Sequence, residues 1–393
     1  MTLNRRDFLK ASASLAAVSV GSAGCLSSAS RTGLARTADV APPFLHGVAS
    51  GDPLADRVIL WTRVTPPPGL HEGFDVRFEV ASDPGMRSIV SKGRVVARAS
   101  SDYTVKVDPA SLAPGRSYFY RFDALGEASP VGRTRTLPEG RVDRLRFGVA
   151  SCANYPQGYF NAYSSLAQRG DLDAVLHLGD YLYEYGRDGY GGDAGLGRDV
   201  DPAHEILSLA DYRARYAQYR SDPDLQSVHL QHPFIAIWDD HEIANNSWRD
   251  GAANHQPETE GNYAARRAAA VRAYFEWMPI RESTPGRIYR SFRFGDLADL
   301  VMLDTRIIGR DAIAANGDRA TALDPGRSIL GDTQAAWLER ELSASKQAGT
   351  AWRVLGQQVM LASHSRPEDR MNPDAWDGYR ASRSRLLSNL GPG

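Results

Sequence analysis

Hydrophobic and polar residues alternate along the first part of the chain, beginning near residue 44. The alternation has a period of two and is clearest at residues 75–80 and 103–107, which indicates strands that bury one face. A further strand is expected at residues 58–61, where the run Val-Ile-Leu-Trp is apolar throughout. Proline and glycine separate these runs as turns. The pattern therefore predicts an all-β domain over residues 44–140.

The end of this region carries a turn followed by an aromatic strand. Residues 112–122, Leu-Ala-Pro-Gly-Arg-Ser-Tyr-Phe-Tyr-Arg-Phe, resemble the tyrosine-corner strand of fibronectin-type sandwiches. In those domains the hydroxyl of a tyrosine ties the corner to the backbone. We therefore expect an N-terminal β-sandwich of the fibronectin or immunoglobulin type, which flanks the site without supplying catalytic groups.

The pattern changes after residue 140, where short apolar runs alternate with helical segments. Three runs are apolar nearly throughout, as is typical of parallel strands buried on both faces: 146–150, 174–178 and 234–238. Helical periodicity appears at 158–168, 209–220, 263–277 and 333–346. Further strands are expected at 289–294, 300–304 and 353–360. The sequence thus predicts an α/β domain over residues 141–393.

Side-chain patterns on two of these helices suggest which faces are buried. The helix at 209–220 has an aromatic face, which we expect in the core: Tyr212, Tyr216 and Tyr219. The helix at 263–277 carries a basic set that we expect to be exposed to solvent: Arg266, Arg267 and Arg272. The glycine-rich loop at 186–197 is too long to be only a connection, so we expect it to face the substrate.

Length and charge narrow the class of protein. The chain has 393 residues, more than a usual single domain, which agrees with the two domains read from the pattern. Its net charge is −1 at pH 7, so it lacks the basic footprint of a nucleic-acid-binding protein.

The N-terminus resembles a twin-arginine export signal, since Arg5-Arg6 is followed by Phe8-Leu9-Lys10 and a mildly apolar stretch. We therefore expect a signal segment over residues 1–30 and a linker over 31–43. The twin-arginine machinery would carry the folded protein to the periplasm or outside the cell. Ser22-Ala23-Gly24-Cys25 also resembles a lipoprotein cleavage box, so the chain is anchored to a membrane only if Cys25 is lipidated; simple cleavage is the alternative.

Chemically active side chains follow the three buried strands of the α/β domain. They are Cys152 after the first strand, Asp180 and Tyr183 after the second, and Asp240 and His241 after the third. Ligands of α/β sheets bind at the carboxyl ends of the strands, so we expect these groups to meet. Thiolate, carboxylate, phenolate and imidazole are groups that hard or borderline metal ions take. The sequence predicts a metal-dependent hydrolase site.

The individual roles follow from the chemistry of each group. Asp180 ends a buried strand, where an unpaired carboxylate is costly, so it should bind a metal or cap the next helix. Tyr183 loses its phenol proton only to a strongly acidic cation, which favours ferric iron over magnesium alone. His241 is either a ligand or a general acid for the leaving-group oxygen.

Two motifs carry a resemblance to a known family. Gly-Asp-x-x-Tyr at Gly179–Tyr183, with Asp-Asp-His-Glu at Asp239–Glu242, is similar to the binuclear metallophosphoesterases, and Asp240 matches the branch of PhoD-type alkaline phosphatases. The resemblance extends along nearly the whole chain through segments in the same order: 46–53, 59–63, 150–152, 179–184, 238–246, 278–281 and 303–306.

The resemblance implies an exported alkaline phosphatase or phosphodiesterase with a four-layer αββα catalytic domain behind the β-sandwich. It implies that Cys152, Asp180 and Tyr183 hold Fe³⁺, that Asp180 bridges to Ca²⁺, and that Asp240 ligates the calcium. His241 would contact the phosphate or its leaving group, while metal-activated water attacks phosphorus. An amide from Asn245 or Asn246 would complete the site, with no choice between the two.

The chain departs from the family at its end. Family members have a later strand that ends in Gly-Asp-x-His, and this element does not occur after Asp240. The late histidine His364 is better read as a loop or packing residue. We therefore expect a shortened catalytic domain, with an incomplete metal site and an exposed sheet edge. The alternatives to a working phosphatase are a non-catalytic remnant with a partial metal site, or another phosphoester hydrolase of phosphotriesterase or phytase type.

Overall fold

The computed structural model describes residues 43–192, 195–315, 317–363 and 371–390. The signal segment expected at 1–30, with Cys25, lies outside the described residues. So do His364 and all but the last residue of the expected linker.

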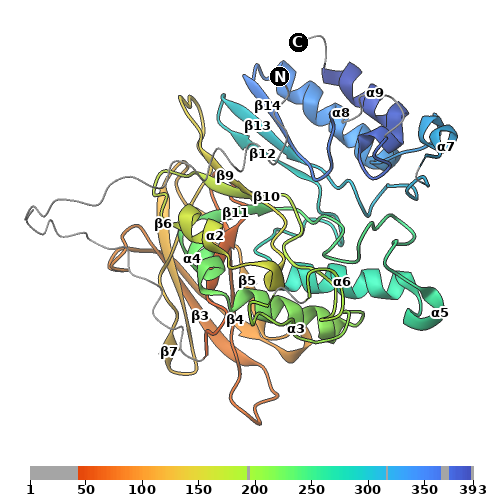
Figure 1. Ribbon diagram of the computed structural model, residues 1–393. Coiled ribbons are helices and arrows are strands. Elements are labelled where there is room, and N and C mark those ends of the chain that lie inside the picture. Colours follow the sequence, from red (N-terminus) through yellow and green to blue (C-terminus); the bar gives the residue numbers. More distant parts are fainter. Residues whose placement is uncertain (1–42, 193–194, 316, 364–370, 391–393) are drawn as a thin grey trace, which may run out of the picture. The chain divides into compact units, whose positions relative to one another are not determined.

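The three buried strands of the α/β region form one end of a six-stranded sheet. They are β9 (Phe147–Ala150), β10 (Ala174–His177) and β11 (Pro233–Ala236), and they pair in parallel, with β10 in the middle. The sheet continues through β1 (Val48–Gly51), β2 (Ile59–Arg63) and β5 (Thr104–Val107). Strand β1 pairs in parallel with β11. Strands from the N-terminal region are therefore part of the same sheet as the strands that lead to the site (Figure 1).

A second sheet completes the expected β-sandwich. It is antiparallel and contains β3 (Phe74–Ala81), β4 (Ile89–Ala97), β6 (Ser117–Ala124), β7 (Glu127–Ala128) and β8 (Gly132–Arg135). Its inner side chains, such as Val80 and Phe122, share a buried cluster with Val48, Leu60 and Val105 of the larger sheet. The sandwich is confirmed. The region before residue 140 also contributes to the core on the other side of the sheet, where Ala49, Trp61 and Leu137 pack with residues of the α/β part.

The tyrosine corner is also confirmed. The backbone N–H of Ala113 donates a hydrogen bond to Tyr118 Oη at 2.7 Å, across the turn that precedes β6. The Tyr118 ring is buried in the sandwich core. The bond therefore fixes the turn to the strand that follows it.

A three-stranded sheet supplies the second β layer of the α/β part. It contains β12 (Arg290–Phe294), β13 (Ala298–Met302) and β14 (Trp352–Gly356). Side chains of β13 alternate between two cores: Leu300 and Met302 lie in the cluster of the six-stranded sheet, whereas Val301 packs with Trp337 of α8 (Gly331–Gln347). Alternation with a period of two thus places a helix layer outside this sheet, as the four-layer arrangement requires.

The other helices lie mostly around the six-stranded sheet (Figure 1). They are α2 (Asn161–Ala167), α3 (Leu209–Arg220), α4 (Pro223–Gln231), α5 (Pro257–Glu260) and α6 (Tyr263–Trp277), while α7 (Arg319–Leu323) and α9 (Arg380–Leu390) belong to the last part of the chain. Short 3₁₀ turns are η1 (Ala99–Ser101), η2 (Tyr155–Gln157) and η3 (Trp376–Tyr379). The start of α3 is fixed by a capping box, in which Ser208 and Asp211 each satisfy the other's backbone N–H.

The predicted aromatic face of α3 is confirmed, but the predicted basic face of α6 is wrong in part. Tyr212, Tyr216 and Tyr219 are fully buried. Arg272 is exposed, whereas Arg266 is buried and forms ion pairs with Glu205 at 2.7 Å and Glu260 at 3.2 Å. Arg266 also donates a hydrogen bond to Tyr212 Oη of α3 at 3.1 Å. This arginine therefore lies on the side of α6 that packs against α3.

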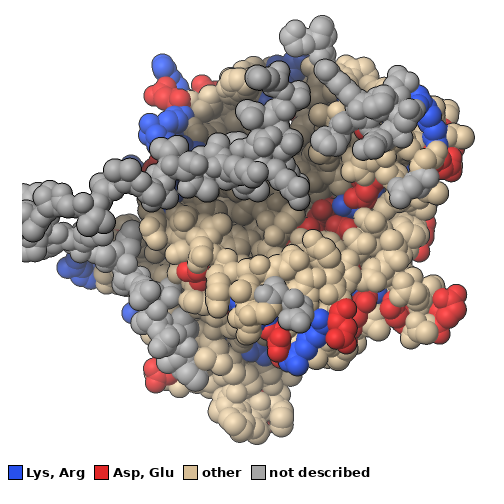
Figure 2. Space-filling view, in the orientation of Figure 1, with Lys and Arg blue, Asp and Glu red and all other residues tan. Residues whose placement is uncertain are grey.

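Charges over the described surface are mixed. Acidic and basic side chains lie next to one another at several places on the face in Figure 2, without a large area of one sign. This agrees with the net charge of −1. Among the helices of the described ranges, none combines the length and the apolar character needed to cross a membrane.

The tyrosine corner gives a first test. Tyr118→Phe removes the acceptor of the Ala113 N–H, and we expect the free energy of unfolding to fall by about 1 kcal/mol. Urea denaturation measures this change. Tyr190→Phe is the matched control, since Tyr190 is 61% exposed. Equal stability of the two variants would contradict a structural role for the corner.

Buried histidines give a second test. Burial, together with the charges of Arg63 and Arg220, lowers the pKa of His46 to about 3. The unfolded chain then binds a proton near pH 6.5 that the folded chain does not, so stability is present above this pH and declines as the pH falls toward 3.

The expected slope is at most about 1.4 kcal/mol per pH unit for one such group. Comparing unfolding at pH 5 and pH 7 should show a smaller pH dependence in His46→Gln than in the natural chain. His71→Gln, at an exposed position, is the control. An unchanged dependence in His46→Gln would remove this histidine as a source of acid sensitivity.

Candidate metal centre

The carboxyl ends of β9, β10 and β11 bring together the loops that hold the predicted site residues. The parallel register aligns His177 of β10 with Ala150 and Ala236 of its neighbours. Beyond the strands, the N–H of Cys152 donates to the carbonyl oxygen of Gly179 at 3.2 Å, so the first two loops stay paired. The sheet itself therefore accounts for the meeting of residues that lie far apart in the sequence.

A sharp backbone turn aims Asp180 into this meeting point. Gly179 and Asp180 both have positive φ angles, +98° and +52°. A Cβ on residue 179 would lie 2.2 Å from the backbone nitrogen of Asp239, so only glycine lets the two loops approach this closely. A non-glycine residue with positive φ is a strained conformation of the kind that clusters at functional sites.

Three of the predicted residues form a group that can hold a cation. Asp180, Asp240 and His241 each offer one ligand atom, and these atoms lie within 4.8 Å of one another. Asp180 Oδ1 is buried and has no hydrogen-bond partner among the described residues. Burial, followed by the charge of Asp240, raises the pKa of Asp180. A buried acceptor without a donor, beside a second carboxylate, is what a bound cation would satisfy.

Cys152 and Tyr183 lie on the Asp180 side of this group. Tyr183 Oη donates to Asp180 Oδ2 at 3.1 Å. Cys152 is exposed as a residue, but its thiol is partly buried beside Asp180, and this burial and the carboxylate together raise its pKa to about 11. Burial and the same neighbours raise the pKa of Tyr183. Both groups keep their protons unless a cation displaces them.

His241 is held by Glu184 on one side and by an aromatic ring on the other. Its Nδ1 lies 2.7 Å from Glu184 Oε2, and its ring stacks on Tyr183 with centroids 4.2 Å apart. Burial alone would lower its pKa, but the carboxylates of Glu184, Asp240 and Asp180 outweigh burial and raise the pKa to about 10. With Nδ1 engaged, Nε2 is the atom that remains for a ligand or a proton transfer.

Two glutamates brace the loops instead of joining the cation group. Glu242 accepts hydrogen bonds from the backbone N–H groups of Asp180, Tyr181 and Asp239, at 3.1, 2.6 and 2.8 Å. Glu184 accepts from the backbone N–H of Asn245 as well as holding His241. Neither bracing role is indicated by the sequence, in which Glu242 only ends the Asp239–Glu242 motif. For Glu184, the one signal is its position next to Tyr183.

Arg306 is the counter-charge of the acidic cluster, a role that no local pattern in the sequence indicates. It is buried and reaches Asp239 at 2.5 Å, Asp240 at 3.3 Å and Asp374 at 2.6 Å. Burial raises the pKa of Asp239 to about 8 although Arg306 opposes the shift. Asp240 behaves differently: burial is outweighed by Arg306, His241 and the Asn246 N–H, and its pKa is lowered.

The two asparagines that remained open contribute through their backbones. The Asn246 N–H donates to Asp240 Oδ2 at 2.5 Å, and Asn246 has a positive φ of 56°. The Asn245 N–H donates to Glu184 Oε1 at 2.6 Å. Both residues therefore orient acids of the site, and the contacts do not single out either side-chain amide as a ligand.

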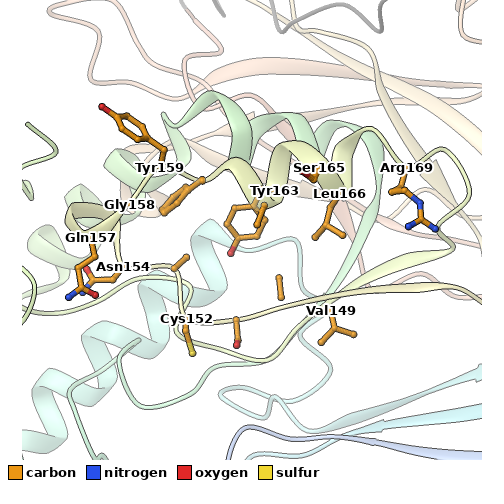
Figure 3. A pocket seen from close by; sticks show the side chains of 15 residues that line it. Val149, Cys152, Asn154, Gln157, Gly158, Tyr159, Tyr163, Ser165, Leu166 and Arg169 are labelled. Atoms are coloured by element: carbon orange, nitrogen blue, oxygen red, sulfur yellow. The ribbon is translucent and has the colours of Figure 1, made fainter. Parts of the chain in front are cut away.

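A hollow of about 850 Å³ opens beside Cys152, between β9 and α2. Figure 3 shows Cys152 and Val149 along one side, with Tyr163 and Leu166 of α2 along the other. Asp180, Asp240 and His241 do not line this space. It borders the candidate centre only through Cys152.

The sequence and the fold are both similar to those of known phosphatases. A family model described as PhoD-like phosphatase matches residues 147–391, and a model of the N-terminal domain of PhoD-like phosphatases matches residues 27–138. The chain is 40% identical to alkaline phosphatase D of Bacillus subtilis (strain 168), over 98% of this chain and 68% of that protein. A solved structure titled "Structure of PhoD" superposes with a TM-score of 0.82 at 39% identity, covering 88% of this chain and 69% of that one.

The cation group can be tested by metal content. Asp180→Asn keeps the size of the side chain but removes its charge, and we expect metal affinity to fall by about tenfold or more, as for changes around metal ligands. Elemental analysis after reconstitution and gel filtration, with calorimetric titration, measures the loss. Asp56→Asn, at an exposed position, is the control. Equal metal content in both variants would rule out Asp180 as a ligand.

Proposed function

This chain belongs to the PhoD-like phosphatase family and is a metal-dependent hydrolase of phosphate esters, and from this premise we propose that it is an exported alkaline phosphatase that uses ferric iron and calcium. The observation that carries the proposal is the group of Asp180, Asp240 and His241, whose ligand atoms lie within 4.8 Å of one another beside Cys152 and Tyr183. Phosphate monoesters and diesters are its proposed substrates.

The donor set supports this choice of metals. Cys152, Asp180 and Tyr183 would hold Fe³⁺, because a thiol and a phenol with raised pKa values give up their protons only to a strongly acidic cation. Asp180 and Asp240 would hold Ca²⁺, which prefers carboxylate oxygens. When bound, such cations supply Lewis acidity toward phosphate oxygens and make water more acidic.

The side chains of the chain itself would position the reacting groups. Glu184 holds His241 through Nδ1, so Nε2 would carry the proton that is donated to the leaving-group oxygen. Arg306 keeps Asp239 and Asp240 in place, and Glu242 fixes the loop that carries Asp180. The departing alcohol would therefore take its proton from His241.

Export and domain organisation follow as further parts of the proposal. We assign residues 1–30 to a twin-arginine signal and 31–43 to a linker. Residues 44–140 form the sandwich and 141–393 belong to the catalytic domain. The destination is the periplasm or the outside of the cell, with a membrane anchor only if Cys25 is lipidated. Export that persists when Arg5 and Arg6 are both changed to Lys would argue against the twin-arginine route.

The acid role of His241 gives a specific kinetic test. The chain is reconstituted with Fe³⁺ and Ca²⁺ and assayed on 4-nitrophenyl phosphate and on ethyl phosphate. We expect His241→Asn to lower kcat for ethyl phosphate by about 100-fold, the size typical of a lost general acid. The effect on 4-nitrophenyl phosphate should be much smaller, since its leaving group departs without a proton.

The control is His204→Asn, at an exposed position on a loop, which should leave both rates unchanged. Equal losses on the two esters would mean that His241 acts as a ligand or a support and not as the acid. An absence of metal-dependent turnover in the natural chain would contradict the proposed function itself.

A further inference from the structure

Aromatic rings continue outward from His241 in an unbroken row. The ring of Tyr183 stacks on the imidazole of His241, with centroids 4.2 Å apart, and the centroid of the Tyr185 ring lies 5.5 Å from that of the imidazole. Tyr190 follows, with its ring centroid 5.9 Å from that of Tyr185. Tyr183 is buried, Tyr185 is half-buried and Tyr190 is 61% exposed. The row thus leads from the cation group to solvent.

The glycine-rich loop holds Tyr190 in this position by two consecutive turns. The N–H of Gly189 donates to Gly186 O at 3.0 Å, and the N–H of Gly192 donates to Gly189 O at 3.1 Å. In the second turn Tyr190 occupies the second position, and Gly191, with φ of +74°, occupies the third, as in a type II turn. The tyrosine therefore stands at the tip of a hydrogen-bonded loop.

Close contacts fix both sides of the tip. A Cβ on residue 189 would lie 2.7 Å from the Cβ of Tyr185, and a Cβ on residue 191 would lie 2.6 Å from the side chain of Gln157. The glycines let the loop rest directly on Tyr185 on one side and on η2 on the other. Since η2 follows the loop of Cys152, the tip spans from the His241 side of the centre toward the Cys152 side.

An exposed tyrosine such as Tyr190 is common on protein surfaces, and packing of the half-buried Tyr185 would account for the contact between these two rings. Packing alone does not explain why the row of rings begins at His241. His241 is the group proposed to protonate the leaving alcohol, so the rings that adjoin it would lie near the rest of that alcohol. Aromatic faces of this kind bind planar rings by offset or edge-to-face contact.

We propose that Tyr185 and Tyr190 form a subsite for a planar aromatic ring carried by the leaving group of the phosphate ester. The inference rests on the proposed function, because it uses His241 as the mark of the leaving-group side. The subsite selects esters of ring-bearing alcohols over esters of small aliphatic alcohols. The ring is either attached close to the ester carbon, as in an aryl alcohol, or carried across a sugar, as in a nucleoside.

Two matched substrate pairs test the subsite in the metal-reconstituted chain. Benzyl and ethyl phosphate are both esters of primary alcohols, and adenosine 5′-monophosphate and ribose 5-phosphate share the same ester bond. We expect kcat/KM to favour the ring-bearing member of at least one pair by roughly threefold to tenfold, the range for an aromatic pair. Tyr190→Ala should bring that preference close to one, and Tyr190→Phe should keep it.

The pair that responds identifies the source of the ring, an aryl alcohol or a nucleoside. Trp352→Ala is the control, since Trp352 is 66% exposed on β14 of the three-stranded sheet. The inference is overturned if neither preference changes in Tyr190→Ala, or if ring-bearing and small esters lose activity equally. If the natural chain hydrolyses ethyl phosphate, the proposed function is supported independently of whether the subsite exists.

A binding measurement tests the subsite without requiring that the chain hydrolyse an ester. Calorimetric titration compares benzylphosphonate with ethylphosphonate, neither of which can be hydrolysed at an ester bond. A tighter Kd for benzylphosphonate that is lost in Tyr190→Ala and kept in Tyr190→Phe supports the subsite. Equal Kd values for the two phosphonates in the natural chain contradict it.

Discussion

Mutual repulsion among the carboxylates of Asp180, Asp239 and Asp240 is the constraint on which the structure around the site depends. Each of them is largely buried, where an uncompensated charge costs several kcal/mol. Arg306 compensates Asp239 and Asp240, and the backbone N–H of Asn246 adds to Asp240. Asp180 has less: Tyr183 serves one oxygen, and the other has no partner among the described residues. Of the three carboxylates, Asp180 is therefore the one whose charge is least compensated.

The scaffold that holds this cluster extends well beyond the α/β core. Strand β1 joins the sandwich to β11, and directly after it Asp52 is fully buried. Asp52 pairs with Arg290 of β12 at 2.6 Å and accepts the N–H of Arg281 at 2.8 Å. One carboxylate thus links the end of the sandwich sheet to the three-stranded sheet. The sandwich is a support for the site and not an appendage, because removing β1 would expose an edge of the strand that leads to Asp240.

Local patterns in the sequence were sufficient for most of the fold. The helix expected at 263–277 has the same bounds in the structure, and the strand expected at 353–360 ends earlier, at Gly356. Proximity of the five candidate residues also followed from the sequence, because the ends of adjacent parallel strands must meet. Partners from distant segments could not be found in this way. Arg306 lies 67 residues after Asp239, and Glu205 lies 61 residues before its partner Arg266, so neither pairing has a local periodic signal.

Tyr183 connects the two halves of the proposed chemistry. Its hydroxyl contacts Asp180 on the cation side, and its ring stacks on His241 on the leaving-group side. A phenol that loses its proton to a cation becomes richer in electrons, and an imidazolium stacked on such a ring is stabilised by the charge and the ring face together. Loading of the cation site would then favour the protonated form of His241, although the added positive charge nearby opposes it. Glu184 offsets that opposition, since its buried carboxylate lies 2.7 Å from Nδ1 and belongs to neither cation. The proposed acid and the proposed metal centre would thus each have a buried carboxylate of its own.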